Sequence, residues 1–241
     1  MKSEFTIIVP IFNEEDNLAR LEKELNDYIN IAPLKTSVLL VNDGSTDNSL
    51  SKIEGICIVN DAFEFISFEN NQGLSTALKA GFDYVTCPLV GYMDADLQTS
   101  PEDFNLLLEH IDQYELVSGV RHNRKDTWLK NFSSKMANRV RRLFTNDGME
   151  DTGCPLKVFK TETAKRIPMF RGLHRFLPAM TLLQNGCVKQ VPVRHFPRQA
   201  GTSKYGFGKR LLGPLADCFV FLWMKRKYIN YQIDKSSSDS A

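Results

Sequence analysis

Short apolar runs alternate with helix-like segments through the first half of this chain, and this alternation most constrains how it can fold. The apolar runs predict strands at residues 5–9, 37–41, 63–68, 89–93 and 116–119. Apolar residues at helical spacing predict helices at 15–29, from 46, at 73–85 and at 101–111. Strands that alternate with short helices favour an α/β fold, in which helices flank a mostly parallel central sheet on both faces.

The second half of the chain continues this pattern with more basic segments. Residues 127–144 form a basic, helix-compatible stretch, and we expect strands at 156–159 and 188–196, helices at 174–183 and 209–229, and a polar loop at 198–205. We interpret residues 1–208 as one domain, 209–230 as an amphipathic helix suited to a membrane interface, and 231–241 as a disordered polar tail.

Three of the expected strands are followed directly by a cluster of polar residues. The clusters are 10–14 (Pro-Ile-Phe-Asn-Glu), 42–45 (Asn-Asp-Gly-Ser) and 94–98 (Asp-Ala-Asp-Leu-Gln), and Pro10 is expected to end the first strand. In parallel α/β sheets, ligands bind beyond the carboxyl ends of the strands, where such loops converge. The three clusters therefore predict one shared crevice.

Asp94 and Asp96 are the strongest candidates for binding a metal ion. Two carboxylates at this spacing after a strand reach the same hard divalent cation, and the amide oxygen of Gln98 is a further ligand. The chain has no G-x-G-x-x-G after its first strand and no G-x-x-x-x-G-K-[ST]. Mg²⁺ or Mn²⁺ bridging a diphosphate would then bind the phosphates that glycine-rich loops bind in other nucleotide-binding proteins. A solvated acidic loop is the alternative interpretation.

The other two clusters allow a binding and a structural interpretation. Asp43 is placed to accept hydrogen bonds from a base or ribose, whereas Ser45 or Asp47 caps the next helix. Residues 10–14 also fit an ordinary loop and helix start, and residues 71–73 fit the end of a turn.

Charge is divided unevenly along the chain. Residues 1–120 carry 6 Lys and Arg against 21 Asp and Glu, a balance of −15, whereas residues 121–241 carry 24 against 8, a balance of +16. This polarity predicts a basic face for phosphates, nucleic acid or a membrane surface, unless folding intermixes the two halves. No recognised nucleic-acid module accompanies the basic half, so nucleic acid is not an expected partner.

Cysteine usage and hydropathy indicate a cytoplasmic protein. The five cysteines are scattered without a C-x-x-C pair, which fits neither a disulfide framework nor a zinc site. No signal peptide is recognisable, and the longest apolar run, 218–224, is far shorter than the roughly 20 residues that span a bilayer. His195 is expected as a strand residue rather than a metal ligand.

Several motifs, taken together, resemble a known family. Segments 8–14, 41–47, 71–73, 94–98 and 118–121 resemble the ordered motifs of family 2 glycosyltransferases with the GT-A fold. Segments 124–128, 151–154 and 198–205 are similar to the polyisoprenyl-phosphate glycosyltransferases, a group that includes dolichyl-phosphate mannose synthase and bacterial undecaprenyl-phosphate sugar transferases. The resemblance extends from about residue 4 to residue 225.

The resemblance also implies a set of site residues. Those implied to bind the nucleotide sugar are Pro10, Asn13, Glu14, Asp43, Asn71, Gly73 and Asp94. The implied metal ligands are Asp94, Asp96 and Gln98, and the implied acceptor-phosphate residues are Arg121, Lys130, Ser134 and Lys204. Asp96, Asp151 and Arg198 are implied to be catalytic. We expect Asp151 to position groups rather than to abstract a proton, because a phosphate monoester is already largely ionised at pH 7.

By the same resemblance, the chain is an inverting enzyme that moves a sugar from a UDP- or GDP-sugar to a polyprenyl phosphate on the cytoplasmic face of the membrane, for cell-envelope glycan or glycolipid synthesis. A family 2 enzyme with a glycan or soluble acceptor is the first alternative, and a non-catalytic nucleotide-sugar-binding module at the membrane is the second. Attachment would be peripheral or through a separate membrane protein.

Two segments carry the membrane interpretation. Residues 121–142 hold eight Lys and Arg against one acid, and Phe219, Phe221, Leu222 and Trp223 precede the basic segment 225–227. A solvated basic helix and a core-packed helix are the respective alternatives.

Overall fold

The computed structural model describes residues 4–121, 141–197 and 209–229, with only the backbone described for 209–215. The elements in chain order are β1 (Phe5–Ile11), α1 (Leu18–Ile29), β2 (Thr36–Asn42), α2 (Ser49–Val59), β3 (Phe63–Ser67), α3 (Leu74–Tyr84), β4 (Leu89–Tyr92), the 3₁₀ turn η1 (Pro101–Asp103), α4 (Phe104–Leu108), β5 (Leu116–Arg121), β6 (Lys157–Lys160), α6 (Thr161–Arg166), the 3₁₀ turn η2 (Leu173–Arg175), α7 (Leu177–Leu183), β7 (Val188–Val193) and α8 (Lys209–Lys227).

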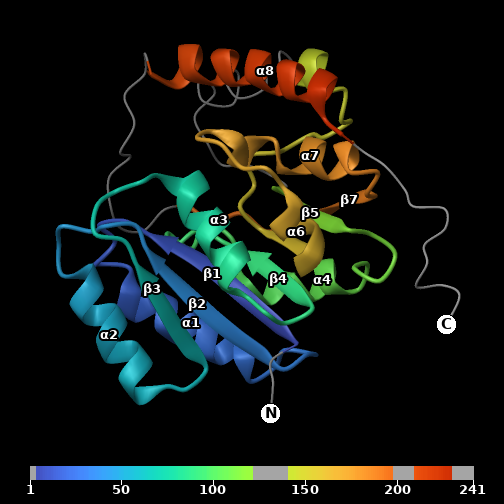
Figure 1. The fold of residues 1–241 in the computed structure, drawn as a ribbon. Helices are drawn as coiled ribbons and strands as arrows, with labels where there is room; N and C mark the ends of the chain where they lie inside the picture. The colour runs from blue at the N-terminus through green and yellow to red at the C-terminus, as the bar shows by residue number, and fades with distance from the viewer. Residues whose placement is uncertain (1–3, 122–140, 198–208, 230–241) are drawn as a thin grey trace, which may run out of the picture.

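One seven-stranded sheet organises the described residues, in the order β3-β2-β1-β4-β6-β5-β7 (Figure 1). The first four strands in this order are parallel, and β5 and β7 are parallel to each other. Strand β6 runs antiparallel to both of its neighbours, β4 and β5. The predicted α/β fold with a mostly parallel sheet is confirmed.

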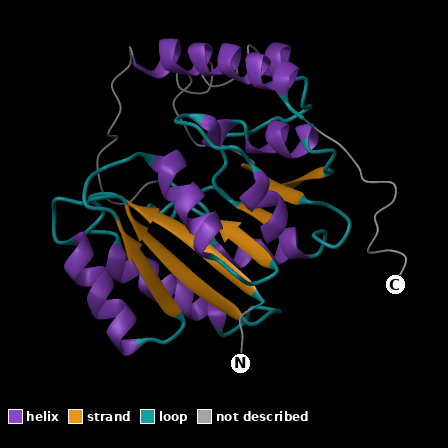
Figure 2. Ribbon diagram, viewed as in Figure 1, coloured by secondary structure: helices purple, strands orange, loops and turns teal. Residues whose placement is uncertain are grey.

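Helices cover both faces of the sheet (Figure 2). Two apolar cores lie between the helices and the sheet, one on each face. The core on one face joins α1, α2 and α4 to alternate side chains of β1, among them Phe5, Ile7 and Val9. The core on the other face joins α3, α6 and α7 to side chains such as Ile8 and Phe159. Strands buried on both faces are expected to be apolar throughout, which explains the continuous apolar runs in the sequence.

The prediction that Pro10 ends the first strand is wrong, because β1 continues to Ile11 and Pro10 pairs in register with Val41. In a strand the backbone groups of alternate residues point to the same side. The carbonyl of Ile8 accepts a hydrogen bond from Met93, so Pro10 also faces the β4 side. Pairing with β4 stops at Ile8, and a proline, which has no N–H, costs no ladder hydrogen bond there.

Several predicted boundaries also shift. Helices α1 and α2 begin three residues later than expected, because the loops before them are held by side-chain hydrogen bonds such as that from Glu15 N to Asp47 (3.2 Å). The segment predicted as helix 101–111 consists of η1 and the short α4. Helix α6, with its buried Ala164, was not predicted at all. Its six residues are too few to show a helical period.

The C-terminal helix is confirmed over 209–227, and it lies at the end of the molecule beyond α7 (Figure 1). Of the two interpretations of this helix, core packing holds for Phe221, whose ring is buried and stacks on Phe176 with centroids 5.5 Å apart, whereas Phe219 and Trp223 are exposed. Within the described residues, no helix combines the length and the apolarity that a membrane crossing needs. Residues 141–145 are helical, and the rest of the basic segment 127–144 lies outside the described residues, as does the loop 198–205.

Candidate active site

The polar loops after β1 and β2 are joined by Asn13. Its backbone N–H donates to Ser45 Oγ (3.0 Å), its side-chain Oδ1 accepts from the N–H of Thr46 (2.7 Å), and Nδ2 donates to Thr46 Oγ1 (3.2 Å). Asn13 has a φ of 51°, a left-handed conformation that asparagine tolerates better than most residues. The two predicted clusters therefore lie together, and Asn13 fixes their spacing.

Glu14 lies beside this junction and is held locally. Its backbone N–H donates to Ser49 Oγ (3.0 Å) at the start of α2, and Oε2 accepts from Asn17 Nδ2 (2.7 Å). Ser49 thus connects the β1 loop to the helix after β2, in addition to the contacts that Ser45 and Asp47 make with the same loop. The N–H of Ser49 in turn donates to Asp47 Oδ1 (2.9 Å). The N-cap residue of α2 is Asn48, however, and Ser45 accepts from Asn13, so the prediction that Ser45 or Asp47 is the cap is wrong.

Asp43 is a buried carboxylate that organises the loop before α3. Its oxygens accept from the N–H groups of Gln72 (2.7 Å) and Gly73 (2.9 Å) and from Asn71 Nδ2 (3.0 Å). Burial raises the pKa of Asp43, and the two backbone hydrogen bonds oppose that shift. The structure therefore brings three predicted residues, Asp43, Asn71 and Gly73, into one cluster.

Gly44 makes the contact between the β2 loop and residues 70–73 possible. It has a φ of 64°, and a Cβ at this position would lie 2.4 Å from the carbonyl carbon of Asn70 and 2.5 Å from the nitrogen of Asn71. Both the conformation and the space exclude any larger side chain.

The acidic turn after β4 carries Asp94, Asp96 and Gln98. Tyr92 donates its hydroxyl to Asp94 Oδ1 (2.6 Å), and the N–H of Gln98 donates to Asp96 Oδ1 (3.2 Å). Burial and the neighbouring charge of Asp96 together raise the pKa of Asp94 to about 6. Two carboxylates that repel each other in a poorly solvated turn are stabilised by a shared cation.

This donor set fits a hard divalent metal ion. Carboxylate and amide oxygens are the ligands that Mg²⁺ and Mn²⁺ prefer, and two protein carboxylates are enough when substrate phosphates and water complete the coordination. In the part of the chain that the structure describes, His, Cys, Asp and Glu side chains form no group of three or more arranged to hold a metal by themselves. Asp94, Asp96 and Gln98 would supply the protein ligands of such an ion.

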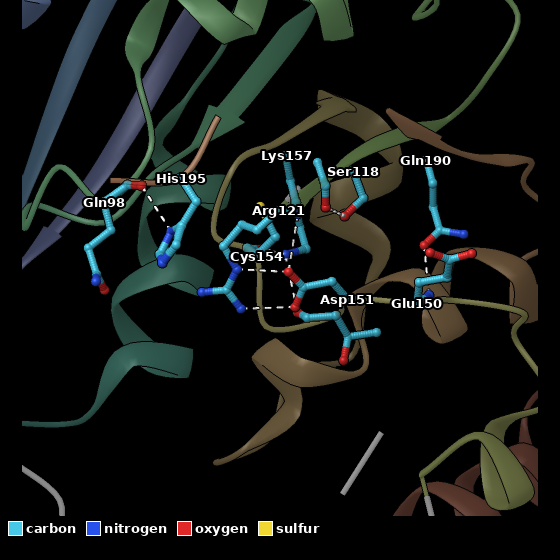
Figure 3. Close-up of polar contacts among 11 residues, drawn as sticks. Gln98, Ser118, Arg121, Glu150, Asp151, Cys154, Lys157, Gln190 and His195 are labelled. Carbon is cyan, nitrogen blue, oxygen red and sulfur yellow. Dashed lines mark hydrogen bonds and ion pairs between the residues drawn. The ribbon is translucent and has the colours of Figure 1, made fainter. Parts of the chain in front are cut away.

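Arg121, the last residue of β5, forms a bidentate ion pair with Asp151 (Figure 3). Nε donates to Oδ2 (2.7 Å), Nη2 to Oδ1 (2.9 Å), and the backbone N–H of Arg121 also points at Oδ2 (3.3 Å). The side chains are only 12% and 8% exposed. The hydrogen bonds and charge of Asp151 raise the pKa of Arg121 despite the opposing effect of burial.

Cys154 and Lys157 complete this part of the site and were not predicted from the sequence. Both are buried beside the Arg121–Asp151 pair (Figure 3). Lys157 lies 5.9 Å from the centroid of the Tyr92 ring, and its ammonium donates to the carbonyl of Cys154. A lysine inside the apolar run 156–159 was the available signal, since an interior strand position rarely accepts an unpaired charge.

The loop after β7 closes one side of the acidic turn. The carbonyl of Gln98 accepts from the N–H of Phe196 (2.9 Å) and lies 3.2 Å from His195 Nδ1. The prediction that His195 is a strand residue is wrong, because β7 ends at Val193 and Arg194 turns to bind Asp103. Among the predicted site residues, Lys130, Ser134, Arg198 and Lys204 lie outside the described residues.

A family model of known proteins matches most of this chain. Residues 6–168 match the model of glycosyl transferase family 2, and this range contains the loops after β1, β2 and β4 together with Arg121, Asp151 and Lys157.

Solved structures share the fold at low sequence identity. Glucosyl-3-phosphoglycerate synthase from Mycobacterium tuberculosis, in complex with Mn²⁺, UDP-glucose and phosphoglyceric acid, has 12% identity and a TM-score of 0.71, with 95% of this chain and 81% of that chain covered. A mannosyltransferase from Pyrobaculum calidifontis, in complex with GDP-mannose and Mn²⁺, has 19% identity and a TM-score of 0.61, with 97% and 66% covered. This chain thus spans slightly less than two thirds of the mannosyltransferase.

Proposed function

The chain belongs to glycosyltransferase family 2, and on that premise we propose that it transfers a sugar, with inversion, from a UDP- or GDP-sugar to a polyprenyl phosphate at the cytoplasmic face of a membrane. The observation that carries the proposal is geometric: Lys157 of β6 lies opposite both Tyr92, which binds Asp94, and Ser118 of β5, the strand that ends at Arg121. The acidic turn 94–98 and the buried Arg121–Asp151 pair therefore lie near each other at one end of the sheet. Such a site offers groups for a metal and for phosphates together.

The nucleoside would bind over the loops after β1 and β2. Asp43 holds residues 71–73 in place, and Asn13 holds the two loops at a fixed distance. Pro10 and Glu14 line the same end of the sheet. Preorganised loops of this kind lower the entropic cost of binding a nucleotide. The complexes of the solved relatives with UDP-glucose and with GDP-mannose support both donor classes.

The donor diphosphate would bind at the acidic turn together with Mg²⁺ or Mn²⁺. Asp94, Asp96 and Gln98 would hold the metal, which when bound stabilises the negative charge that develops on the leaving diphosphate. Tyr92 keeps Asp94 oriented through its hydroxyl. Mn²⁺ in the complexes of both relatives supports this cofactor.

In the proposed reaction an oxygen of the acceptor phosphate forms a bond to the anomeric carbon while the bond from that carbon to the diphosphate breaks. The acceptor phosphate is largely ionised at neutral pH, so no strong base is required. Arg121 would neutralise phosphate charge, and Asp151 would orient Arg121 through its bidentate contact. From the resemblance we also propose Lys130, Ser134 and Lys204 as acceptor-phosphate residues and Arg198 and Asp96 as catalytic residues.

A mixed apolar and basic surface supports an acceptor that resides in a membrane. Leu143, Phe219 and Trp223 are 80%, 59% and 64% exposed, and the rings of Phe144 and Phe219 meet edge to face with centroids 5.3 Å apart. The basic residues Lys225, Arg226 and Lys227 are also exposed, at the end of α8. Exposed aromatic residues beside lysine and arginine suit an interface with anionic headgroups.

A transfer assay tests the acceptor. The purified protein is incubated with UDP- and GDP-sugars and with Mn²⁺ or Mg²⁺, in the presence and absence of polyprenyl phosphate. We expect UDP or GDP release that depends on the lipid, together with a sugar product that partitions into organic solvent. Lipid-independent transfer to a water-soluble acceptor would refute the lipid acceptor while preserving the glycosyltransferase.

Matched variants test whether the acidic turn does the chemistry. Asp96→Asn is expected to reduce turnover at least a hundredfold, because it removes one of two carboxylates at the proposed metal site. Asp61→Asn changes an exposed acid outside the site and is expected to leave turnover unchanged. Equal activity of both variants would contradict the proposed site.

A vesicle assay tests the membrane surface separately. Trp223→Ser is expected to weaken sedimentation with anionic vesicles several-fold, whereas Ile58→Ser, which changes an 82% exposed residue on α2, is expected to have no effect. Equal binding of the wild-type protein to neutral and anionic vesicles would argue against the role of the basic residues.

A further inference from the structure

Lys157 is a buried cation at the centre of the site, and it is not among the residues proposed above to bind the donor or the acceptor. It lies on β6, directly opposite Tyr92 of β4 and Ser118 of β5, and only 1% of the residue is exposed. Burial lowers the pKa of Lys157. An amine in such a place is costly, and a leucine or methionine of similar size would pack there without that cost.

The ammonium of Lys157 is used to hold one turn of the chain. Nζ donates to the carbonyl of Cys154 and lies 3.4 Å from the carbonyl of Thr152. These two carbonyls belong to the turn that directly follows Asp151. Buried carbonyls need hydrogen-bond partners, so Lys157 satisfies two acceptors that would otherwise be stranded near the site.

Strand β5 contacts the end of the same turn. A Cβ at Gly119 would lie 3.0 Å from Cys154 Sγ and 3.2 Å from the carbonyl oxygen of Leu156. The N–H of Gly119 donates to that same carbonyl (2.8 Å). The turn is therefore held at two places, by β5 at Cys154 and Leu156 and by the ammonium of Lys157 at the carbonyls of Thr152 and Cys154.

Asp151 depends on this turn for its orientation. Its carboxylate aligns both guanidinium contacts of Arg121, and a bidentate contact tolerates little displacement of either partner. Figure 3 shows Lys157 and Cys154 beside the Arg121–Asp151 pair. A shift of the 152–154 turn would therefore change where Arg121 points.

We propose that Lys157 is a positioning residue for the transfer reaction: its ammonium fixes the 152–154 turn, which holds Asp151 and through it Arg121 in the orientation that the reaction requires. The inference rests on the proposed function only in assigning Arg121 and Asp151 to that reaction. Lys157 itself touches neither donor nor acceptor in this role, so its removal affects turnover more than donor binding.

The test compares Lys157→Met with Lys160→Met. Both replace a lysine of β6 by an apolar residue of similar length, but Lys160 lies at the outer end of the strand, where it pairs with Glu115. We expect Lys157→Met to lower kcat at least tenfold. The dissociation constant with which the protein binds the UDP- or GDP-sugar in the presence of Mn²⁺, measured by calorimetry, is expected to change less than threefold. Lys160→Met is expected to change neither. Lys157→Arg, which retains donors for the two carbonyls, is expected to recover most of the lost kcat.

Amide hydrogen exchange supplies a readout that does not depend on the reaction. We expect exchange in the peptide covering 151–156 to rise at least tenfold in Lys157→Met and to stay unchanged in Lys160→Met. Unchanged exchange would overturn the positioning role even if no acceptor were found, whereas absence of transfer by the wild-type protein would count against the proposed function alone. A parallel loss of donor binding and kcat in Lys157→Met would also overturn the positioning role. If Lys157→Met does not fold, Lys157→Gln takes its place in both measurements.

Discussion

Two arginines at neighbouring strand ends make nearly the same contacts in different surroundings. Arg121 ends β5 and Arg194 follows β7, and in register Arg121 lies opposite Val193. Each donates Nε and its own backbone N–H to one aspartate, Asp151 for Arg121 and Asp103 for Arg194. The second guanidinium contact of Arg121 goes to the same Asp151, whereas that of Arg194 goes to Glu102 (2.8 Å).

Burial separates the two pairs. Both aspartates are buried, with side chains 4% exposed for Asp103 and 8% for Asp151, so the difference lies in the arginines. The side chain of Arg194 is 49% exposed, whereas that of Arg121 is 12% exposed and shares its surroundings with Asp94 and Lys157. Water reaches the guanidinium of the outer pair, Arg194–Asp103, and screens its charge, whereas both partners of the inner pair, Arg121–Asp151, are shielded from solvent. We therefore expect the Arg194 contact to contribute little to stability. Loss of either partner from the Arg121–Asp151 pair would instead leave an uncompensated buried charge.

Removal of one partner from the inner pair is expected to have the largest effect. Arg121→Met leaves Asp151 buried without its main counter-charge, and such a loss costs about 3–5 kcal/mol of the free energy of unfolding. Chemical denaturation of the variant and the wild-type protein measures it. A loss below 1 kcal/mol would mean that water reaches Asp151, and the contrast between the two pairs would then fail.

The double variant Arg121→Met/Asp151→Leu serves as the control. Replacing a buried ion pair by apolar residues is often neutral for stability. We expect it to recover most of the lost stability but none of the turnover, because the proposed function needs the charges. Recovery of turnover in the double variant would remove Arg121 from the proposed site.

A third buried carboxylate, Asp43, extends the comparison because amide groups hold it in place of an arginine. Its contacts depend on the approach of Gly44 to residues 70–71. Gly44→Ala places a Cβ in a left-handed residue and against backbone, which is expected to cost about 2 kcal/mol or more.

Gly55→Ala is the matched control for Gly44→Ala, because no atom lies within 4 Å of the new Cβ and the residue is inside α2. There the substitution is expected to stabilise the protein by about 0.5–1 kcal/mol. Thermal denaturation compares the two variants. The same sign for both would show that the loop after β2 can shift without cost.

Parts of this arrangement were predictable from the sequence, and the reason is locality. Asp43, Asp94 and Asp96 each follow an apolar strand directly, so the sequence alone places them at one edge of the sheet. Pairing partners are different, because Arg121 and Asp151 are thirty positions apart and meet only through the antiparallel β6. No periodicity in the chain predicts that strand's direction.

Lys157 and Pro10 show the same limit in opposite ways. A lysine usually indicates a solvated position, but Lys157 is buried and donates to the carbonyls of Thr152 and Cys154, and no local sequence pattern predicts these partners. Proline usually ends a strand, but β4 stops early enough that the missing N–H costs nothing. In both cases tertiary context overrides a propensity that is correct on average.

Low pH is expected to destabilise the protein through a buried histidine, His174. His174 is buried against Ser75 (ring nitrogen to hydroxyl, 3.0 Å), and burial, with smaller contributions from Arg175 and Lys157, lowers its pKa to about 3. The unfolded chain binds this proton near pH 6.5 and the folded chain does not, so stability falls as the pH drops below 6.5. At pH 5.5 the free energy of unfolding is expected to be about 1.4 kcal/mol lower than well above pH 6.5. Chemical denaturation under both conditions measures the difference, and His174→Gln is expected to lack it.

The outer pair is expected to give the smallest effect, and it completes the comparison. Arg194→Met removes the guanidinium from a half-exposed contact, while the backbone N–H of residue 194 still donates to Asp103 (2.7 Å). Asp103 is buried but keeps this backbone hydrogen bond, and the lost guanidinium is half exposed and screened by water. An ion pair screened in this way contributes about 0–1 kcal/mol, and high salt reduces this further. We therefore expect a loss below about 1 kcal/mol in denaturation at low salt and almost none in 1 M NaCl. A loss as large as that of Arg121→Met, unchanged by salt, would mean that geometry rather than burial sets the strength of both pairs.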